Sequence, residues 1–430
     1  MNKTGLLFFS LTFNASIAIN IKPHTFMVFM ERNNDLDPFA SLNIKQMEHV
    51  GSNEHINIIV YMHCRENKTK TLFIKKNEST LLRETKPNRR TFNIKHELIQ
   101  FCAETIQNYP AENYSLILWD HGTGAIEPCF RNITSSIFSY APTQQHPQSQ
   151  HTTLLLKNIS RKKQHILKGV CFDDSEGTFL SEKDLQSALE TICATSLCKK
   201  KFDLIGFDAC LMSMIEVGSS IKNYATYMVG SQEVELGTGW NYARVFAPFL
   251  LGNISPRTLS LHIVNSYAKS YQKTDDYTQS AINLSVLSEL EQNVHSVAQH
   301  LTSLLKQQQS NVFRRALKAS RNKHYCTHFD EPDFIDLHHF YKNLLSNASQ
   351  IALLDEKSNT LLKSLRQELI NGCLLIKETV VANKAGTKKA LATGISIYFP
   401  EKQIYSSYHR AAFTLSNQSW INFLRIYLSE

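Results

Sequence analysis

The chain has 430 residues, of which 42% are hydrophobic and 20% charged, so it is long enough to bury a large core in one or two domains. Its net charge is +8, from 46 basic and 38 acidic residues. The basic clusters at 161–163 and 199–201 lack the interleaved aromatic residues and the basic face of nucleic-acid-binding proteins. We therefore expect a solvated surface and no nucleic-acid partner.

Residues 1–18 have the pattern of a secretory signal peptide. Lys3 precedes an apolar run at 5–13, and the small residues Ser16 and Ala18 stand where a signal peptidase would cleave. The run is too short to cross a bilayer, which needs about 20 apolar residues, and no later segment is apolar enough. We expect a secreted or periplasmic protein without a membrane span; the alternative is a buried N-terminal strand.

Short apolar runs alternate with helical patterns in the first half of the chain. The apolar runs cover 24–30, 56–62, 114–119, 202–207 and 227–231, and helical spacing covers 94–108 and 211–223. This alternation predicts a mainly parallel sheet with helices on both faces. Ligands bind such sheets beyond the carboxyl ends of the strands.

The pattern changes at two later points. Residues 131–169 are polar and irregular, which predicts a mobile surface insert. Beyond residue 255 the spacing is mainly helical, over 256–273, 285–308, 334–346 and 350–370, before a last strand at 394–399. We therefore expect an α/β domain at 24–255 and a mainly helical region at 256–430 packed on it.

The cysteines and histidines do not indicate a metal site. The nine cysteines form no CxxC pair and no zinc spacing, and their odd number allows at least one free thiol. His324, His328, His338 and His339 also match no zinc pattern, so a surface cluster is favoured over a zinc hydrolase.

Two predicted strands end in residues suited to nucleophilic catalysis. The strand at 114–119 runs into Asp120-His121-Gly122, and the strand at 202–207 runs into Asp208-Ala209-Cys210. A thiolate and an imidazole at neighbouring strand ends are what a cysteine peptidase needs. A helix beginning directly after Cys210 would aim backbone N–H groups at the thiolate. Either residue alone would more often be structural, and only their joint placement favours catalysis.

These blocks resemble the His and Cys blocks of the clostripain family of cysteine peptidases. The similarity covers 116–124 and 208–212 and continues at 27–36, 231–240 and 395–400. The resemblance implies a caspase-like three-layer sandwich, as in gingipains and legumains. It also implies a dyad of Cys210 and His121 without an obligatory third member, with the substrate oxyanion held by the amides of Gly122 and Cys210.

The resemblance further implies cleavage after Arg or Lys. Asp208 matches the family's acidic residue at the floor of the S1 pocket, although Asp is also favoured as a helix N-cap. Leu236 stands where many relatives have Pro. Thr238 stands where some relatives have an acid, and if that acid helps select basic P1 residues, its absence weakens the expected preference. Glu233 and Glu235 are carboxylates that would compensate unless they lie in a solvated loop. We therefore expect Asp208, Glu233 and Thr238 to bind substrate.

Relatives in the family are typically matured by self-cleavage between the two blocks. The basic residues Arg161, Lys162 and Lys163 in the insert are the expected processing site, the alternative being a passive loop. The expected partners are proteins or peptides with basic residues, and the oligomeric state is not indicated. No cofactor is expected for the chemistry, and calcium is suggested by the resemblance alone. The competing function is a catalytically silent protein-binding module on the same fold.

Overall fold

The computed structural model describes residues 21–65, 68–88, 90–126, 169–175, 177–307, 310–351 and 355–429. The predicted signal peptide at 1–18 lies outside these residues. Residues 131–168 of the predicted insert, with the expected processing site Arg161, Lys162 and Lys163, also lie outside them.

Within the described residues the main sheet has nine strands, in the order β12-β10-β9-β8-β5-β1-β2-β3-β4. Its central strands are all parallel: β1 (Lys22–Glu31), β2 (Ile56–Cys64), β5 (Ala111–Trp119), β8 (Phe202–Asp208) and β9 (Ala225–Gly230). Antiparallel strands extend both edges: β3 (Lys68–Lys75), β4 (Glu78–Thr85), β10 (Thr278–Asn283) and β12 (Val380–Ala385). The five predicted apolar runs correspond to the five parallel strands.

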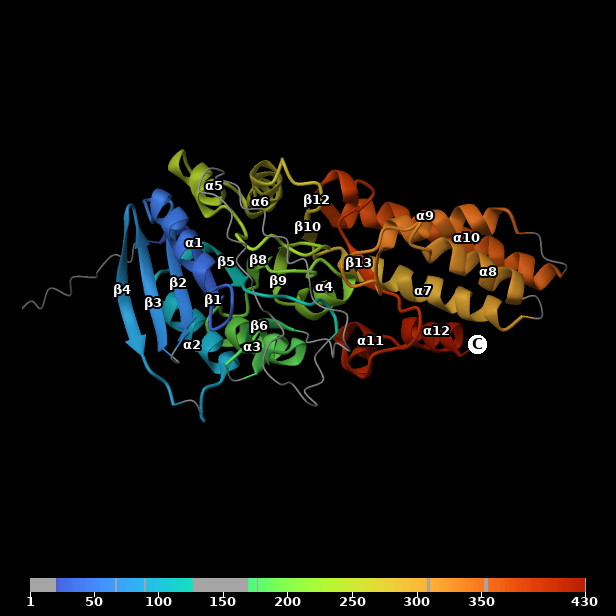
Figure 1. The fold of residues 1–430 in the computed structure, drawn as a ribbon, viewed down its shortest axis with the longest axis horizontal. Helices are drawn as coiled ribbons and strands as arrows, with labels where there is room; N and C mark the ends of the chain where they lie inside the picture. The colour runs from blue at the N-terminus through green and yellow to red at the C-terminus, as the bar shows by residue number, and fades with distance from the viewer. Residues whose placement is uncertain are drawn as a thin grey trace, which may run out of the picture.

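Helices cover both faces of this sheet (Figure 1). One layer contains α1 (Asp37–Val50), α5 (Tyr242–Phe246) and α6 (Pro256–Ser270), and the other contains α2 (Ile94–Asn108), α3 (Glu182–Thr195) and α4 (Ile215–Ile221). Alternation along β1 supplies both cores, because Val28 and Met30 belong to the first core and Met27 and Phe29 to the second. This three-layer arrangement confirms the predicted α/β fold.

The C-terminal part of the chain forms an elongated helical region beside the sheet (Figure 1). It contains α7 (Leu287–Leu305), α8 (Ser310–Arg321), α9 (Leu337–Ser349), α10 (Glu356–Thr379), α11 (Ala412–Ser416) and α12 (Ser419–Leu428). The apolar side chains of α7 belong to the same core as those of α3 and α4. The helical region therefore shares a continuous core with one face of the sheet.

The sequence change at residue 255 is not a boundary of the sheet. Two later strands, β10 and β12, extend the sheet beyond β9. The sequence analysis missed them because their segments, TQSAIN and VVANKA, contain no long apolar run. The predicted strand at 394–399 is present as β13 (Ser396–Tyr398), but it pairs with β11 (Phe334–Asp336) in a separate two-stranded sheet.

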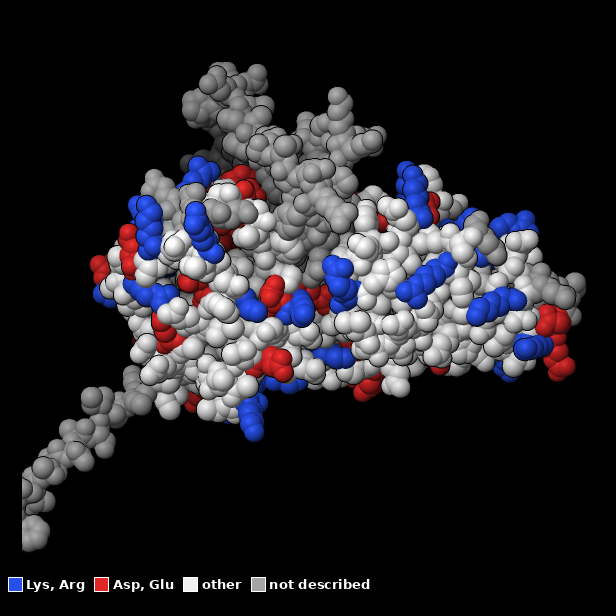
Figure 2. Space-filling model, turned by 90° about the horizontal axis from the view of Figure 1, so that it is seen from below, with Lys and Arg blue, Asp and Glu red and all other residues white. Residues whose placement is uncertain are grey.

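The surface shows no strong concentration of charge on the face drawn in Figure 2. Lysine and arginine side chains are scattered there and do not merge into a continuous patch. Among the described helices, none combines the length and the apolar character needed to cross a membrane.

Candidate active site

The register of β5 and β8 brings His121 and Cys210 to one place. These strands are parallel neighbours, and Trp119 at the end of β5 pairs with Asp208 at the end of β8. His121 and Cys210 each follow this pair by two residues, so both lie just beyond the same edge of the sheet. A Cβ added at Gly122 would lie 2.6 Å from the carbonyl oxygen of Cys210, which shows that the two loops touch.

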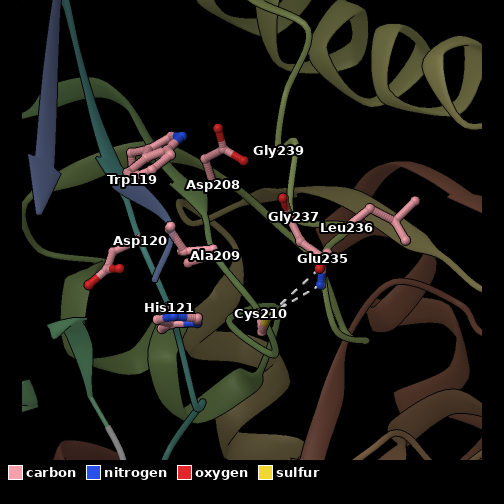
Figure 3. A pocket seen from close by; sticks show the side chains of 11 residues that line it. Trp119, Asp120, His121, Asp208, Ala209, Cys210, Glu235, Leu236, Gly237 and Gly239 are labelled. Atoms are coloured by element: carbon pink, nitrogen blue, oxygen red, sulfur yellow. Dashed lines mark hydrogen bonds between the residues drawn. The ribbon is translucent and has the colours of Figure 1, made fainter. Parts of the chain in front are cut away.

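One pocket lies between these loops, and it has two distinct ends (Figure 3). His121 and Cys210 are at one end, and the Asp208 carboxyl is at the other, next to Gly239. The remaining lining residues come from the β1, β5 and β8 ends and the loop after β9: Leu36, Trp119, Asp120, Ala209, Glu235, Leu236 and Gly237. The arrangement can hold a peptide bond at the thiol and a neighbouring side chain in the depth of the pocket.

His121 is oriented by a carboxylate from a third strand end. β1 lies on the other side of β5, with Met30 paired to Trp119, and the chain continues from it to Asp35. Oδ1 of Asp35 lies 2.7 Å from Nε2 of His121 and accepts its hydrogen bond. Asp35 therefore fixes the orientation of the His121 ring.

The loop of His121 is also held by residues 169–173, the chain that follows the insert. Phe172 donates its backbone N–H to the Asp120 carboxyl, and the Asn34 side chain donates to the same carboxyl at 2.6 Å. The Thr123 N–H donates to the Gly169 carbonyl at 3.2 Å. These bonds fix the backbone on both sides of His121.

The Cys210 thiol is held by the loop that follows β9. Its Sγ accepts the Glu235 backbone N–H at 3.3 Å and lies 3.9 Å from the Glu235 carbonyl oxygen (Figure 3). Burial raises the pKa of Cys210, and the carboxyls of Glu235, Glu233 and Asp330 raise it further, while the Glu235 amide opposes them. The raised pKa favours the thiol form of Cys210, so a base would be needed to form the thiolate.

The helix predicted directly after Cys210 was wrong. Leu211 has φ of +63°, which turns the chain, and Met214 forms a β-bridge with Ser396, so α4 begins only at Ile215. The N–H groups of α4 therefore do not start at Cys210. The loop after β9 provides a backbone donor to the sulfur instead, which the sequence did not reveal.

Asp208 lies in the deep end of the pocket and is fixed by the chain that follows Gly239. The Trp240 N–H donates to both carboxylate oxygens, at 3.0 and 3.2 Å, and the Tyr242 hydroxyl donates to Oδ2 at 2.8 Å. Burial raises the pKa of Asp208 to about 6, against the hydrogen bonds that favour its charged form. It does not cap α4, which begins seven residues later.

Two of the predicted substrate-binding residues, Glu233 and Thr238, do not line this pocket. The Glu233 carboxylate forms an ion pair with Lys389 at 2.5 Å and accepts the Asp330 N–H. The Thr238 hydroxyl is 2.6 Å from that of Tyr271 and does not line the pocket. Glu235, considered only as a compensating carboxylate, is the one that lines it. Glu233 and Glu235 are both 5% exposed, so neither lies in a solvated loop.

A model of the clostripain family matches residues 28–136 and 149–426 of the chain. The chain belongs to the clostripain family. It is therefore a cysteine peptidase, a hydrolase that acts on protein substrates. No curated protein sequence matches it.

Two solved clostripain-family structures have the same fold. One is a secreted C11 cysteine protease from Bacteroides thetaiotaomicron, with 18% identity, a TM-score of 0.58, and coverage of 92% of this chain and 99% of that one. The other is an inactive zymogen C11 protease from Parabacteroides distasonis, with 18% identity, a TM-score of 0.57, and coverage of 94% and 98%. These likenesses confirm that the clostripain-like chain has a caspase-like fold over nearly its whole length.

Two histidines of the predicted cluster in this clostripain-family enzyme, His328 and His339, make structural contacts. His328 bonds through its two ring nitrogens to the carbonyls of Pro332 and Arg321, and His339 Nδ1 accepts from Thr327. In the part of the chain that the structure describes, no three His, Cys, Asp or Glu side chains are grouped so as to hold a metal ion.

Proposed function

We propose that the protein is an exported endopeptidase that cleaves after Arg or Lys, with Cys210 as nucleophile and His121 as general acid and base. The observation that carries this proposal is the shared register at the ends of β5 and β8. That register puts a thiol and an imidazole on adjacent loops, beside a pocket whose deep end contains buried carboxyls. Membership of the family implies that the substrates are proteins. The preference for Arg or Lys before the cleaved bond is what this proposal adds.

His121 takes the thiol proton as Cys210 attacks the scissile carbonyl carbon. The new C–S bond forms while the carbonyl π electrons move to oxygen, giving a tetrahedral intermediate. His121 then gives its proton to the amine that leaves, and an acyl-enzyme remains. Water, deprotonated by the same imidazole, attacks the thioester and releases the acid and the thiol. Asp35 keeps the ring in one orientation throughout and stabilises the imidazolium.

The backbone amides of Gly122 and Cys210 are placed to receive the oxyanion. Neither N–H donates a hydrogen bond to any other described residue. Gly122 lies against the Cys210 loop with no room for a side chain, so a substrate carbonyl can approach its backbone closely. Amides fixed in this way stabilise charge that develops in the transition state without reorganising.

The charge of the pocket favours a basic P1 side chain. Asp208 and Glu235 both line it, and neither forms an ion pair with any described residue. Buried charges in proteins are normally paired, and an unpaired buried carboxyl is costly. An Arg or Lys side chain from the substrate would supply the missing cation.

Export and self-processing complete the proposal. The N-terminal signal pattern supports export, and the basic residues Arg161 to Lys163 would suit an enzyme with this P1 preference. The chemistry uses only side chains and backbone amides of the chain. A calcium requirement, which the family resemblance suggests, is tested by assaying activity with EGTA and after adding calcium back.

The experiment is cleavage of a mixed peptide library by the parent protein and by Cys210→Ala and His121→Ala. We expect cleavage after Arg and Lys by the parent and loss of hydrolysis in both variants, with unchanged circular dichroism. Full activity of Cys210→Ala would exclude the mechanism. Equal turnover of Asp, Leu and Arg at P1 by the parent would exclude the specificity while leaving the mechanism intact. A thiol-directed probe with a basic P1 should label the parent and not Cys210→Ala.

A further inference from the structure

The deep end of the pocket contains two carboxyl groups that differ in their hydrogen-bond partners. Asp208 comes from the end of β8 and Glu235 from the loop after β9, and their side chains interact directly. They are 4% and 5% exposed. Because both groups line the same pocket, a cation that enters it can meet both.

Asp208 and Glu235 differ in how many hydrogen bonds their carboxyl oxygens already accept. Asp208 already accepts from the Trp240 N–H and the Tyr242 hydroxyl. Both oxygens of Glu235 are buried without a partner in hydrogen-bond geometry, although Gln279 and the Trp240 indole lie beside them. Those side-chain nitrogens, Nε2 of Gln279 and Nε1 of Trp240, are unpartnered too. Such a group of buried polar atoms normally has an external partner.

We propose that Glu235 is the direct counter-ion of a basic P1 side chain and that Asp208 supports it from behind. This inference rests on the proposed peptidase function and names the residue that sets its specificity. Because five donors of a guanidinium need several acceptors, the two free oxygens of Glu235 suit Arg better than the engaged oxygens of Asp208 do. The ligand class is an alkylguanidinium or alkylammonium ion.

The pKa shifts of the two pocket carboxyls agree with this assignment. Burial raises the pKa of Glu235 well above its usual range, and the neighbouring Asp208 raises it further. The other titratable groups that face Glu235 are Cys210, Tyr242 on α5, and Tyr267 and Tyr271 on α6. These groups are neutral or acidic, so none of them offsets the cost of ionising both carboxyls. A substrate cation would lower the pKa of the pair, so its binding should release a proton.

The test compares peptides that differ only in Arg or citrulline at P1, because citrulline keeps the shape and removes the charge. Glu235→Gln should lower the Arg-to-citrulline ratio of kcat/KM by about tenfold or more, the size expected for a charge-assisted pair. The matched control is Glu216→Gln, since Glu216 is a buried glutamate on α4 that does not line the pocket. That control should keep the parent ratio.

The proposal would be overturned if Glu235→Gln kept the parent Arg-to-citrulline ratio of kcat/KM. It would also be overturned if Glu233→Gln, and not Glu235→Gln, lowered that ratio.

A second measurement needs no turnover. Agmatine, a free alkylguanidinium, is titrated calorimetrically into Cys210→Ala at pH 6 in two buffers of different ionisation enthalpy. We expect binding with proton release, and weaker binding by at least tenfold in Cys210→Ala with Glu235→Gln. Binding without proton release, or equal affinities, would contradict the role of Glu235. This outcome is distinct from a failure of the peptidase assignment, which only the cleavage assay reports.

Discussion

The Asp35 carboxylate lies 2.7 Å from Nε2 of His121, although the two residues sit at the ends of different strands, β1 and β5. The family resemblance implies a dyad with no obligatory third member. In this chain, however, a carboxylate from the end of another strand orients the imidazole. A third group of this kind fixes the tautomer and the ring position.

Replacing Asp35 by Asn keeps the shape but removes the charge that faces His121. We expect kcat to fall by about tenfold, because a general base that is less well oriented transfers protons less efficiently. KM for a basic peptide and the affinity for agmatine should stay near the parent values, since Asp35 does not line the pocket.

Asp37→Asn is the matched control for that variant. Asp37 is two residues away and pairs with Arg32 at 2.5 Å. A similar loss of kcat in both variants would point to damage of the β1 loop as a whole. Unchanged kcat in Asp35→Asn would show that the dyad works without an orienting carboxylate.

Gly239 is the point where the backbone makes room for Asp208. It has φ of +60°, and an added Cβ would lie 2.6 Å from Oδ1 of Asp208 and 2.9 Å from Oδ2. Gly239→Ala should therefore displace the carboxylate and reduce kcat/KM for Arg peptides more than for citrulline peptides. It should also cost about 1–2 kcal/mol in the free energy of unfolding, because an L-residue is strained at this φ.

Gly252→Ala is a control that separates the effect of backbone strain from the effect of displacing the Asp208 carboxylate. Gly252 also has positive φ, +147°, but nothing lies within 4 Å of an added Cβ. It should lose stability in chemical denaturation while keeping the P1 preference. If Gly239→Ala keeps the preference as well, the close approach to Asp208 does not determine specificity.

The sequence predicts the strand ends well and the loops poorly. The parallel strands of the central sheet are buried on both faces and therefore read as apolar runs, which placed His121 and Cys210 at strand ends. The apolar runs do not reveal the order of the strands in the sheet. The contact of Asp35 with His121 follows from β1 lying beside β5, and no local feature of the sequence indicates it.

The same limit explains why the sequence could not separate Glu233 from Glu235. Glu233 and Glu235 stand two residues apart in one irregular loop, and both are carboxylates of the same length. Their roles separate only because Lys389, on a distant segment, pairs with Glu233 and leaves Glu235 to the pocket. A buried carboxylate with a distant partner cannot be told from an unpaired one without the fold.

Self-processing should occur in the interval between the His block and the Cys block. We expect the parent to give two fragments on a denaturing gel and Cys210→Ala to give one intact chain. The fragments should co-elute under native conditions, because β6 (Val170–Asp173) follows the interval and bonds to Asn34 and Asp120 before it. Replacing Arg161, Lys162 and Lys163 together by Ala should shift or abolish the cut. A single uncut chain with full activity would exclude activation by cleavage.

Glu216 gives a prediction about stability and pH. It lies in α4 and is fully buried, with Oε1 accepting the Tyr398 N–H and the Tyr408 hydroxyl, both at 2.9 Å, and with Oε2 unpartnered. Burial raises its pKa to about 7 from 4.5, and the two donors oppose this rise. The folded chain therefore keeps a proton on Glu216 at pH values where the unfolded chain has lost it.

A group whose folded pKa is raised binds more protons in the folded state, so the protein loses stability as the pH rises from about 4.5 to about 7. Glu216→Gln is always neutral and escapes this loss, so its melting temperature relative to the parent should increase between pH 5 and pH 8. The gain corresponds to at most about 3 kcal/mol. Glu190→Gln, an exposed site on α3, should show no such trend. A difference between Glu216→Gln and the parent that stays constant with pH would mean that Glu216 titrates alike in the folded and unfolded chains.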